Sequence, residues 1–83
     1  MSKLKFDRLI SLSIQKGERV IVPKGEFWEW TWDAGSGSVY LNSSTVGYYS
    51  VRCVEGAIIR PSNLNSGASV NIQGIAFKVV ENV

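Results

Sequence analysis

The chain of 83 residues contains no histidine and a single cysteine, Cys53. Histidine is the most frequent general base and metal ligand, and it is the usual partner of a nucleophilic serine or cysteine. One cysteine can form neither an intramolecular disulfide nor a thiolate zinc site. We therefore expect a protein that is not an enzyme and that holds no metal and no cofactor.

Charge is also scarce. Charged residues make up 19% of the chain, below the usual fraction of about 25%, and the net charge is +2. The nine lysines and arginines are scattered along the sequence, whereas nucleic-acid-binding proteins concentrate positive charge on one face. This pattern disfavours a nucleic-acid partner. Since large apolar side chains are plentiful in so small a chain, we expect burial to be completed against another copy, in a homo-oligomer.

Long hydrophobic runs are absent as well. No stretch approaches the roughly 18 apolar residues of a transmembrane helix, so no membrane association is expected. The opening MSKLKFDRLISLSI alternates instead of forming the apolar centre of a signal peptide. These features predict synthesis in a reducing cytoplasm, with Cys53 as a small, partly buried apolar side chain.

The sequence does contain a clear period of two in its first segment. Five apolar residues fall on even positions, Leu4, Phe6, Ile10, Leu12 and Ile14. This alternation predicts a long strand with one buried face. The sequence QKGE then indicates a turn and RVIV a second strand, so the two strands are expected to form a β-hairpin.

The remainder of the chain shows the same kind of pattern in shorter pieces. No stretch has the 3.6-residue periodicity or the capping signals of a helix. Seven or eight short strands are predicted, with turns about every six to twelve residues. Residues 1–83 are therefore expected to form one all-β domain, a small antiparallel β-sandwich of jelly-roll type.

The last segment, SVNIQGIAFKVVEN, contains a change of phase. Its apolar residues occupy even positions through Ile72 and odd positions from Ile75 onwards. One face of a regular strand cannot hold both sets. We therefore predict a β-bulge or a tight turn at Gln73-Gly74.

All three tryptophans lie in one stretch, EFWEWTWDAG, at every second position. In a strand, Trp28, Trp30 and Trp32 point to one face, and each ring can bury on the order of 200 Å². Three interpretations stay open at this point. The rings form the core of the monomer, an interface between subunits, or a platform for a ligand.

Acidic residues surround this row and bear on the choice of ligand. Glu26 and Glu29 are a conceivable glycosidase pair, although solvent-facing carboxylates explain them more simply. Single-stranded nucleic acid stacks on aromatic rings but requires nearby positive charge. A carbohydrate tolerates carboxylates as hydrogen-bond acceptors. If the row binds a ligand, a carbohydrate is the better candidate.

Two longer phrases resemble a known group of proteins. GERVIVPKGEFWEW resembles the V-x-V-P-x-G-x-x-W opening of small β-structured proteins encoded by bacteriophages. GASVNIQGIAFKVVEN resembles their closing pattern, in which a late strand enters G-I-x-F-x-V-V. The resemblance implies structural roles for four residues. Pro23 and Gly25 build a turn, Trp28 anchors the sheet behind it, and Phe77 packs from the last strand.

Proteins of this group look like virion accessory modules of the head-fibre, decoration or tail-associated type, often trimeric jelly rolls. The resemblance therefore implies a self-associating structural module, with a trimer favoured and other virion proteins as partners. Such a protein is made in the host bacterial cytoplasm and can become part of the virion. Two other functions remain open: a small phage protein that inhibits or sequesters a host defence protein, and a carbohydrate-binding module that uses the tryptophan face.

Overall fold

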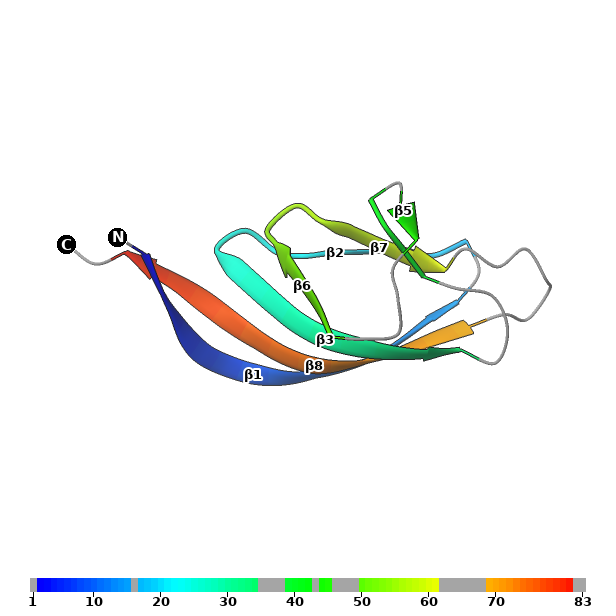
Figure 1. The fold of residues 1–83 in the computed structure, drawn as a ribbon, viewed down its shortest axis with the longest axis horizontal. Helices are drawn as coiled ribbons and strands as arrows, with labels where there is room; N and C mark the ends of the chain where they lie inside the picture. The colour runs from blue at the N-terminus through cyan, green and yellow to red at the C-terminus, as the bar shows by residue number, and fades with distance from the viewer. Residues whose placement is uncertain are drawn as a thin grey trace.

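The structure is a computed structural model that describes residues 2–15, 17–34, 39–42, 44–45, 50–61 and 69–81. This part of the chain contains eight β-strands and no helix, within extents of 48 × 21 × 19 Å (Figure 1). The strands are β1 (Ser2–Gln15), β2 (Val20–Ile21), β3 (Glu26–Ala34), β4 (Val39–Leu41), β5 (Ser44–Thr45), β6 (Val51–Val54), β7 (Ile58–Pro61) and β8 (Ser69–Glu81).

The strands form two antiparallel sheets that face each other as two layers (Figure 1). The long sheet has the order β1-β8-β3-β6, and the short sheet has the order β2-β7-β4-β5. The pairs β1/β8, β2/β7, β3/β6 and β4/β5 are nested within one another, so the chain is folded like a long hairpin rolled into two layers. This is the strand order of a jelly roll, and it confirms the prediction of an all-β sandwich.

The predicted hairpin between the first two strands is wrong. Strand β1 pairs with β8 in the long sheet, whereas β2 pairs with β7 in the short sheet. The turn after β1, closed by a 2.9 Å hydrogen bond from Glu18 N to Gln15 O, carries the chain from one layer to the other. Both the end of β1 and the segment after it bury apolar residues, Ile14 and Val22, which belong to opposite walls of the same core.

The predicted bulge at Gln73-Gly74 is also wrong. Strand β8 runs through these residues in regular register with both of its neighbours. The irregularity lies in β1, where the register shifts between Phe6 and Arg8 and leaves Asp7 as the extra residue. Because of this bulge, even-numbered residues of β1 change face, so Phe6 points away from the core.

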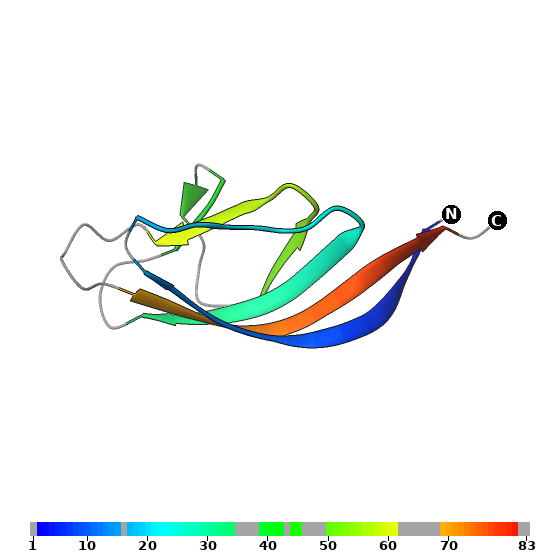
Figure 2. The same cartoon turned by 180° about the vertical axis from the view of Figure 1, so that it is seen from behind.

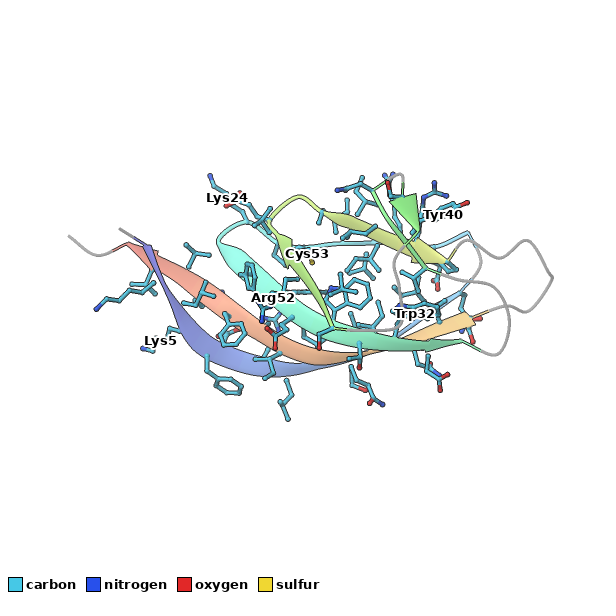
Figure 3. The ribbon with its side chains drawn as sticks, in the orientation of Figure 1. Lys5, Lys24, Trp32, Tyr40, Arg52 and Cys53 are labelled. Carbon is cyan, nitrogen blue, oxygen red and sulfur yellow. The ribbon has the colours of Figure 1, made fainter. Side chains whose placement is uncertain are left out.

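The tryptophan row belongs to the core between the two sheets. Trp28, Trp30 and Trp32 are only 3%, 1% and 9% exposed, and all three lie on the inner face of the long sheet. The other buried apolar residues of the described chain are Ile10, Ile14, Val22, Val39, Cys53, Ala57, Ile59, Val70, Ile72 and Ala76. Figure 3 shows Trp32 and Cys53 in the space between the layers.

Two small residues of β8 make room for these rings. Gly74 pairs with Trp30, and Ala76 pairs with Trp28. A Cβ atom on Gly74 would lie 2.1 Å from the carbonyl oxygen of Glu29 and 2.5 Å from Cα of Trp30. The absence of a side chain therefore allows β8 to approach β3 closely, which is why glycine stands inside a continuous strand.

Strands β1 and β8 continue beyond the rest of the long sheet. The last β3–β8 pair is Glu26 with Lys78, whereas β1 and β8 remain paired as far as Ser2 and Glu81. Residues 2–4 and 79–81 thus form a two-stranded arm that extends past both layers (Figure 2). An isolated two-stranded ribbon is only marginally stable in water, so the arm depends on what it contacts.

Candidate functional site

The tryptophan row does not form a ligand platform or an exposed interface. Its indole groups are directed into the core, where Trp30 Nε1 donates a 3.2 Å hydrogen bond to Cys53 Sγ. Trp28 Nε1 donates a 2.8 Å hydrogen bond to Glu26 Oε1. Of the three interpretations left open by the sequence, the monomer core is confirmed, and a carbohydrate finds no exposed tryptophan ring here.

Cys53 is the thiol against which Trp30 packs. Burial raises the pKa of Cys53, and the hydrogen bond from Trp30 offsets only part of that increase. A buried thiol with a raised pKa carries little thiolate at neutral pH and is therefore a poor nucleophile. This confirms the prediction that Cys53 is a small buried apolar side chain.

An ionic cluster of exposed basic side chains around one buried carboxylate, Glu26, lies where the arm leaves the sandwich. Glu26 is 6% exposed and accepts the hydrogen bond from Trp28. Arg8 Nη2 lies 3.0 Å from Glu26 Oε1, and Lys78 Nζ lies 3.5 Å from Glu26 Oε2. Arg8 also pairs with Asp7, the bulge residue, at 2.6 Å. The cluster therefore ties the bulge of β1 to the first residue of β3 across β8.

The ionisation of Glu26 follows from these contacts. Burial alone would raise its pKa, because a carboxylate loses hydration there. The hydrogen bonds from Trp28 and Arg8, together with the charges of Arg8 and Lys78, outweigh burial and lower the pKa of Glu26 below its ordinary value. Glu26 is therefore a structural carboxylate that remains ionised at neutral pH.

Glu26 and Glu29 do not form a pair of catalytic carboxylates. Successive odd and even residues of β3 point to opposite faces, so Glu26 is directed inward and Glu29 outward. On the outer face, Arg52 Nε donates a 3.0 Å hydrogen bond to Glu29 Oε2. Among the described residues, no three histidine, cysteine or acidic side chains lie close enough to bind a metal ion.

The turn residues predicted from the resemblance are where they were expected. Glu26 N donates to Pro23 O at 3.2 Å, and Gly25 has a φ of +80°, which glycine adopts without strain. Val79 N donates to Gly25 O at 2.8 Å, so this turn also holds β8. Trp28 lies on β3 just after this turn and is buried in the core. The turn has a structural role at the root of the arm.

Phe77 lies elsewhere than predicted. It is directed to the outer face of the long sheet, opposite Phe27 on β3 and Phe6 on β1. The rings of Phe27 and Phe77 are 6.4 Å apart and inclined by 53°. The three phenylalanines of the chain therefore form a row across the outside of the sheet, and this row is the centre of a larger surface.

We call this surface the outer patch. The pairing registers place eight apolar residues on it, Leu4, Phe6, Leu9, Phe27, Val54, Ile75, Phe77 and Val79. Leu9 is 74% exposed and Phe6 is 57% exposed, although both are large apolar side chains. The patch spans all four strands of the long sheet. It contains five of the seven exposed large apolar residues in the described part of the chain.

The other half of the same face is polar. Ser11, Thr31, Asp33, Asn71 and Gln73 border a shallow hollow with a volume of about 430 Å³. These side chains offer hydrogen-bonding groups and a single carboxylate. The outer face therefore changes, along the strands, from polar groups with one carboxylate, Asp33, at one end to the apolar patch beside the arm.

The sequence contains a signal for the outer patch in the positions of its odd-numbered apolar residues. The odd-numbered apolar residues after Ile72 were attributed to a bulge, and Leu9 was an exception to an otherwise even pattern. Both observations arise because the outer face itself is apolar in this region. The alternation therefore predicts the strands correctly. It does not show that the inner and the outer face of the long sheet are both apolar in this region.

Comparison with other proteins gives no family for this chain. No protein-family model, no curated protein and no solved structure matches it. The described residues include no helix that is long and apolar enough to cross a membrane. Any functional conclusion must therefore be drawn from the outer patch and the arm themselves.

Proposed function

We propose that this protein is a non-enzymatic interaction module that self-associates through the outer patch. The observation that carries the proposal is the exposure of large apolar side chains on one face of the long sheet, led by Phe6 and Leu9 on β1 and continued by Val54 and Val79 on β6 and β8. Soluble monomers rarely expose contiguous apolar patches larger than a few hundred Å². A second copy of the chain is the occupant that the patch fits best.

Charge supports a second copy as that occupant. The only ionic groups paired across this end of the outer face, Glu29 and Arg52, neutralise each other at 3.0 Å within the described structure. Two identical patches can therefore approach without like-charge repulsion. The basic groups beside the patch, including Lys5 and Lys78, lie on the opposite face of the ribbon.

Area supports it as well. The exposed part of the patch is on the order of 500 Å², whereas a standard interface buries about 800 Å² on each partner. The neighbouring polar surface at Ser11, Thr31 and Gln73 can supply the difference. An interface with an apolar centre and a polar margin is typical of stable protein association. We expect a trimer.

The biological setting that we propose is a phage virion accessory role. The jelly roll is a fold that occurs repeatedly in viral capsid proteins. The turn at Pro23 and Gly25 and the closing strand of this chain resemble those of phage β-modules. A fold alone does not establish a function. Detection of the protein in purified virions by mass spectrometry would support this role. Its absence there, with recovery of a host protein in a pull-down, would instead favour the inhibitor hypothesis.

Light scattering coupled to size-exclusion chromatography tests the self-association. The wild-type chain is expected to elute at a multiple of its 9.2 kDa monomer mass. Substitution of Phe6 and Leu9 by serine is expected to give a folded monomer. Ile21→Ser is the matched control, because Ile21 is an exposed apolar residue on the short sheet, outside the patch. A monomeric wild type at micromolar concentration would refute the proposal.

A further inference from the structure

We propose a second interaction site beside the outer patch, with which it shares Leu4 and Phe6: the free edge of β1 in and beside the arm binds an extended peptide segment in which acidic and apolar residues alternate. Strand β1 is the outermost strand of the long sheet, and no other described strand pairs with its second edge. Addition of a strand to such an edge satisfies the unpaired backbone groups, and the alternate side chains determine which sequence is accepted.

The side chains along this edge alternate in chemistry. Leu4 and Phe6 point to the outer face, and Lys3 and Lys5 point to the inner face. Opposed residues of adjacent strands share a face, so an added strand would place its side chains directly beside these. Apolar residues suit the outer positions and carboxylates suit the inner ones.

The charge balance of the inner face points to the same ligand. Lys5 is directly opposite Lys78, and like charges in that position repel. Lys78 is compensated on its other side by Glu26, at 3.5 Å. Within the described structure neither Lys3 nor Lys5 forms an ion pair. The lysines on the inner face of β1 therefore have no carboxylate beside them on the unpaired edge of this strand. An acidic side chain on an added strand would occupy that position.

The same charges exclude a second copy of this edge as the occupant. An antiparallel β1–β1 pairing centred on Lys3, Leu4 or Lys5 places lysine opposite lysine. The bulge at Asp7 interrupts a regular pairing centred further along the strand. The edge is therefore suited to a different protein. The unpaired backbone groups of the edge lie in the plane of the long sheet, whereas the outer patch covers its outer face, so binding at the edge does not require self-association.

The test uses the full chain and short capped peptides that alternate glutamate and valine. In an NMR titration, the backbone amides of residues 2–6 are expected to shift saturably, and a peptide that alternates lysine and valine is expected to cause no such shift. The double variant Lys3→Glu/Lys5→Glu should bind the glutamate peptide about tenfold more weakly and should gain affinity for the lysine peptide. Lys24→Glu, an exposed lysine well separated from Lys5 in Figure 3, is the matched control.

Two outcomes would overturn the proposal. In the first, the glutamate peptide causes no saturable shift of the β1 amides, or the Lys3→Glu/Lys5→Glu variant binds it with unchanged affinity. In the second, an oligothymidylate binds the same lysines more tightly than the peptide does, which would identify a nucleic-acid site. The charge-reversed residues are exposed, so the variant is expected to fold, and its circular dichroism spectrum verifies this.

Discussion

The two faces of the long sheet are built from the same strands but have different chemistry. The inner face carries the tryptophan row, and every ring on it is covered by the short sheet. The outer face carries the phenylalanine row, and Phe6 remains more than half exposed. The difference shows that an apolar row in a strand does not by itself indicate a core. What determines its role is whether the molecule supplies a second layer to cover it.

Substitutions on the two faces should have different effects on folding stability, and the largest loss is expected at Trp30 on the inner face. Trp30→Ala is expected to lower the free energy of unfolding by about 4 kcal/mol, because the ring is almost fully buried and leaves a large cavity. That loss approaches the whole stability of a small domain, about 5–10 kcal/mol. Urea denaturation followed by circular dichroism measures it.

Phe6→Ala is the matched substitution on the outer face. It removes an aromatic ring from the same sheet but should change monomer stability by about 1 kcal/mol or less, since the ring is largely solvated. Equal losses for Trp30→Ala and Phe6→Ala would show that both faces are buried within one chain. The outer patch would then no longer be available to a second copy.

The next effect is expected at Gly74, where β8 packs against the backbone of β3 with no room for a side chain. Gly74→Ala should destabilise the protein by about 3 kcal/mol, because the new Cβ would overlap backbone atoms of Glu29 and Trp30. Gly17→Ala is the control. Its φ of +86° costs about 1 kcal/mol, but no atom obstructs the new methyl group. Similar losses at the two sites would mean that strand separation adjusts freely.

The sequence predicted the period of the strands better than their faces. Alternation identified β3 and the turn at Pro23 and Gly25, because local sterics and side-chain direction determine both. It assigned Phe6 and Phe77 to the core, because the bulge at Asp7 carries no distinctive residue such as glycine or proline. Which apolar face is covered depends on long-range strand order, and the spacing of residues in one strand does not encode that order.

The prediction of a hairpin between β1 and β2 was wrong for a related reason. A turn between two strands has similar local chemistry whether the strands pair in one sheet or pass to the opposite layer. In the jelly roll, β1 pairs with the last strand of the chain, and that contact has no local sequence signal. The outer patch and the arm were missed together, because both depend on the pairing of β1 with β8.

The contribution of the ionic cluster around Glu26 to folding stability can be tested by varying the pH. Glu26→Gln should lower stability at pH 7 by about 2 kcal/mol, since the carboxylate accepts hydrogen bonds from Trp28 and from positively charged Arg8. The lowered pKa of Glu26 means that its contribution is complete above its ordinary value of 4.5 and is lost as the pH falls through the folded-state value.

The wild-type and Glu26→Gln proteins are therefore expected to converge in stability as the pH falls below about 4.5, because a protonated Glu26 resembles glutamine. Denaturation at a series of pH values measures the difference between the two. A difference that stayed constant from pH 7 to pH 3 would show that the ionised form of Glu26 is not what stabilises the root of the arm.

The smallest effect is expected for the ion pair on the outer face. Arg52→Ala removes the partner of Glu29, yet stability should change by about 0.5 kcal/mol or less, because both side chains are solvated and water replaces the lost contact.

Self-association should respond differently. In an interface that covers the patch, the unpaired Glu29 of each copy would be buried or would face another carboxylate, so Arg52→Ala should weaken the oligomer more than it weakens the fold. Glu29→Gln/Arg52→Ala, which removes both charges, should restore association. If neither variant alters the oligomer, the interface does not extend to β6, and the contact between copies is confined to the end of the patch formed by β1 and β8.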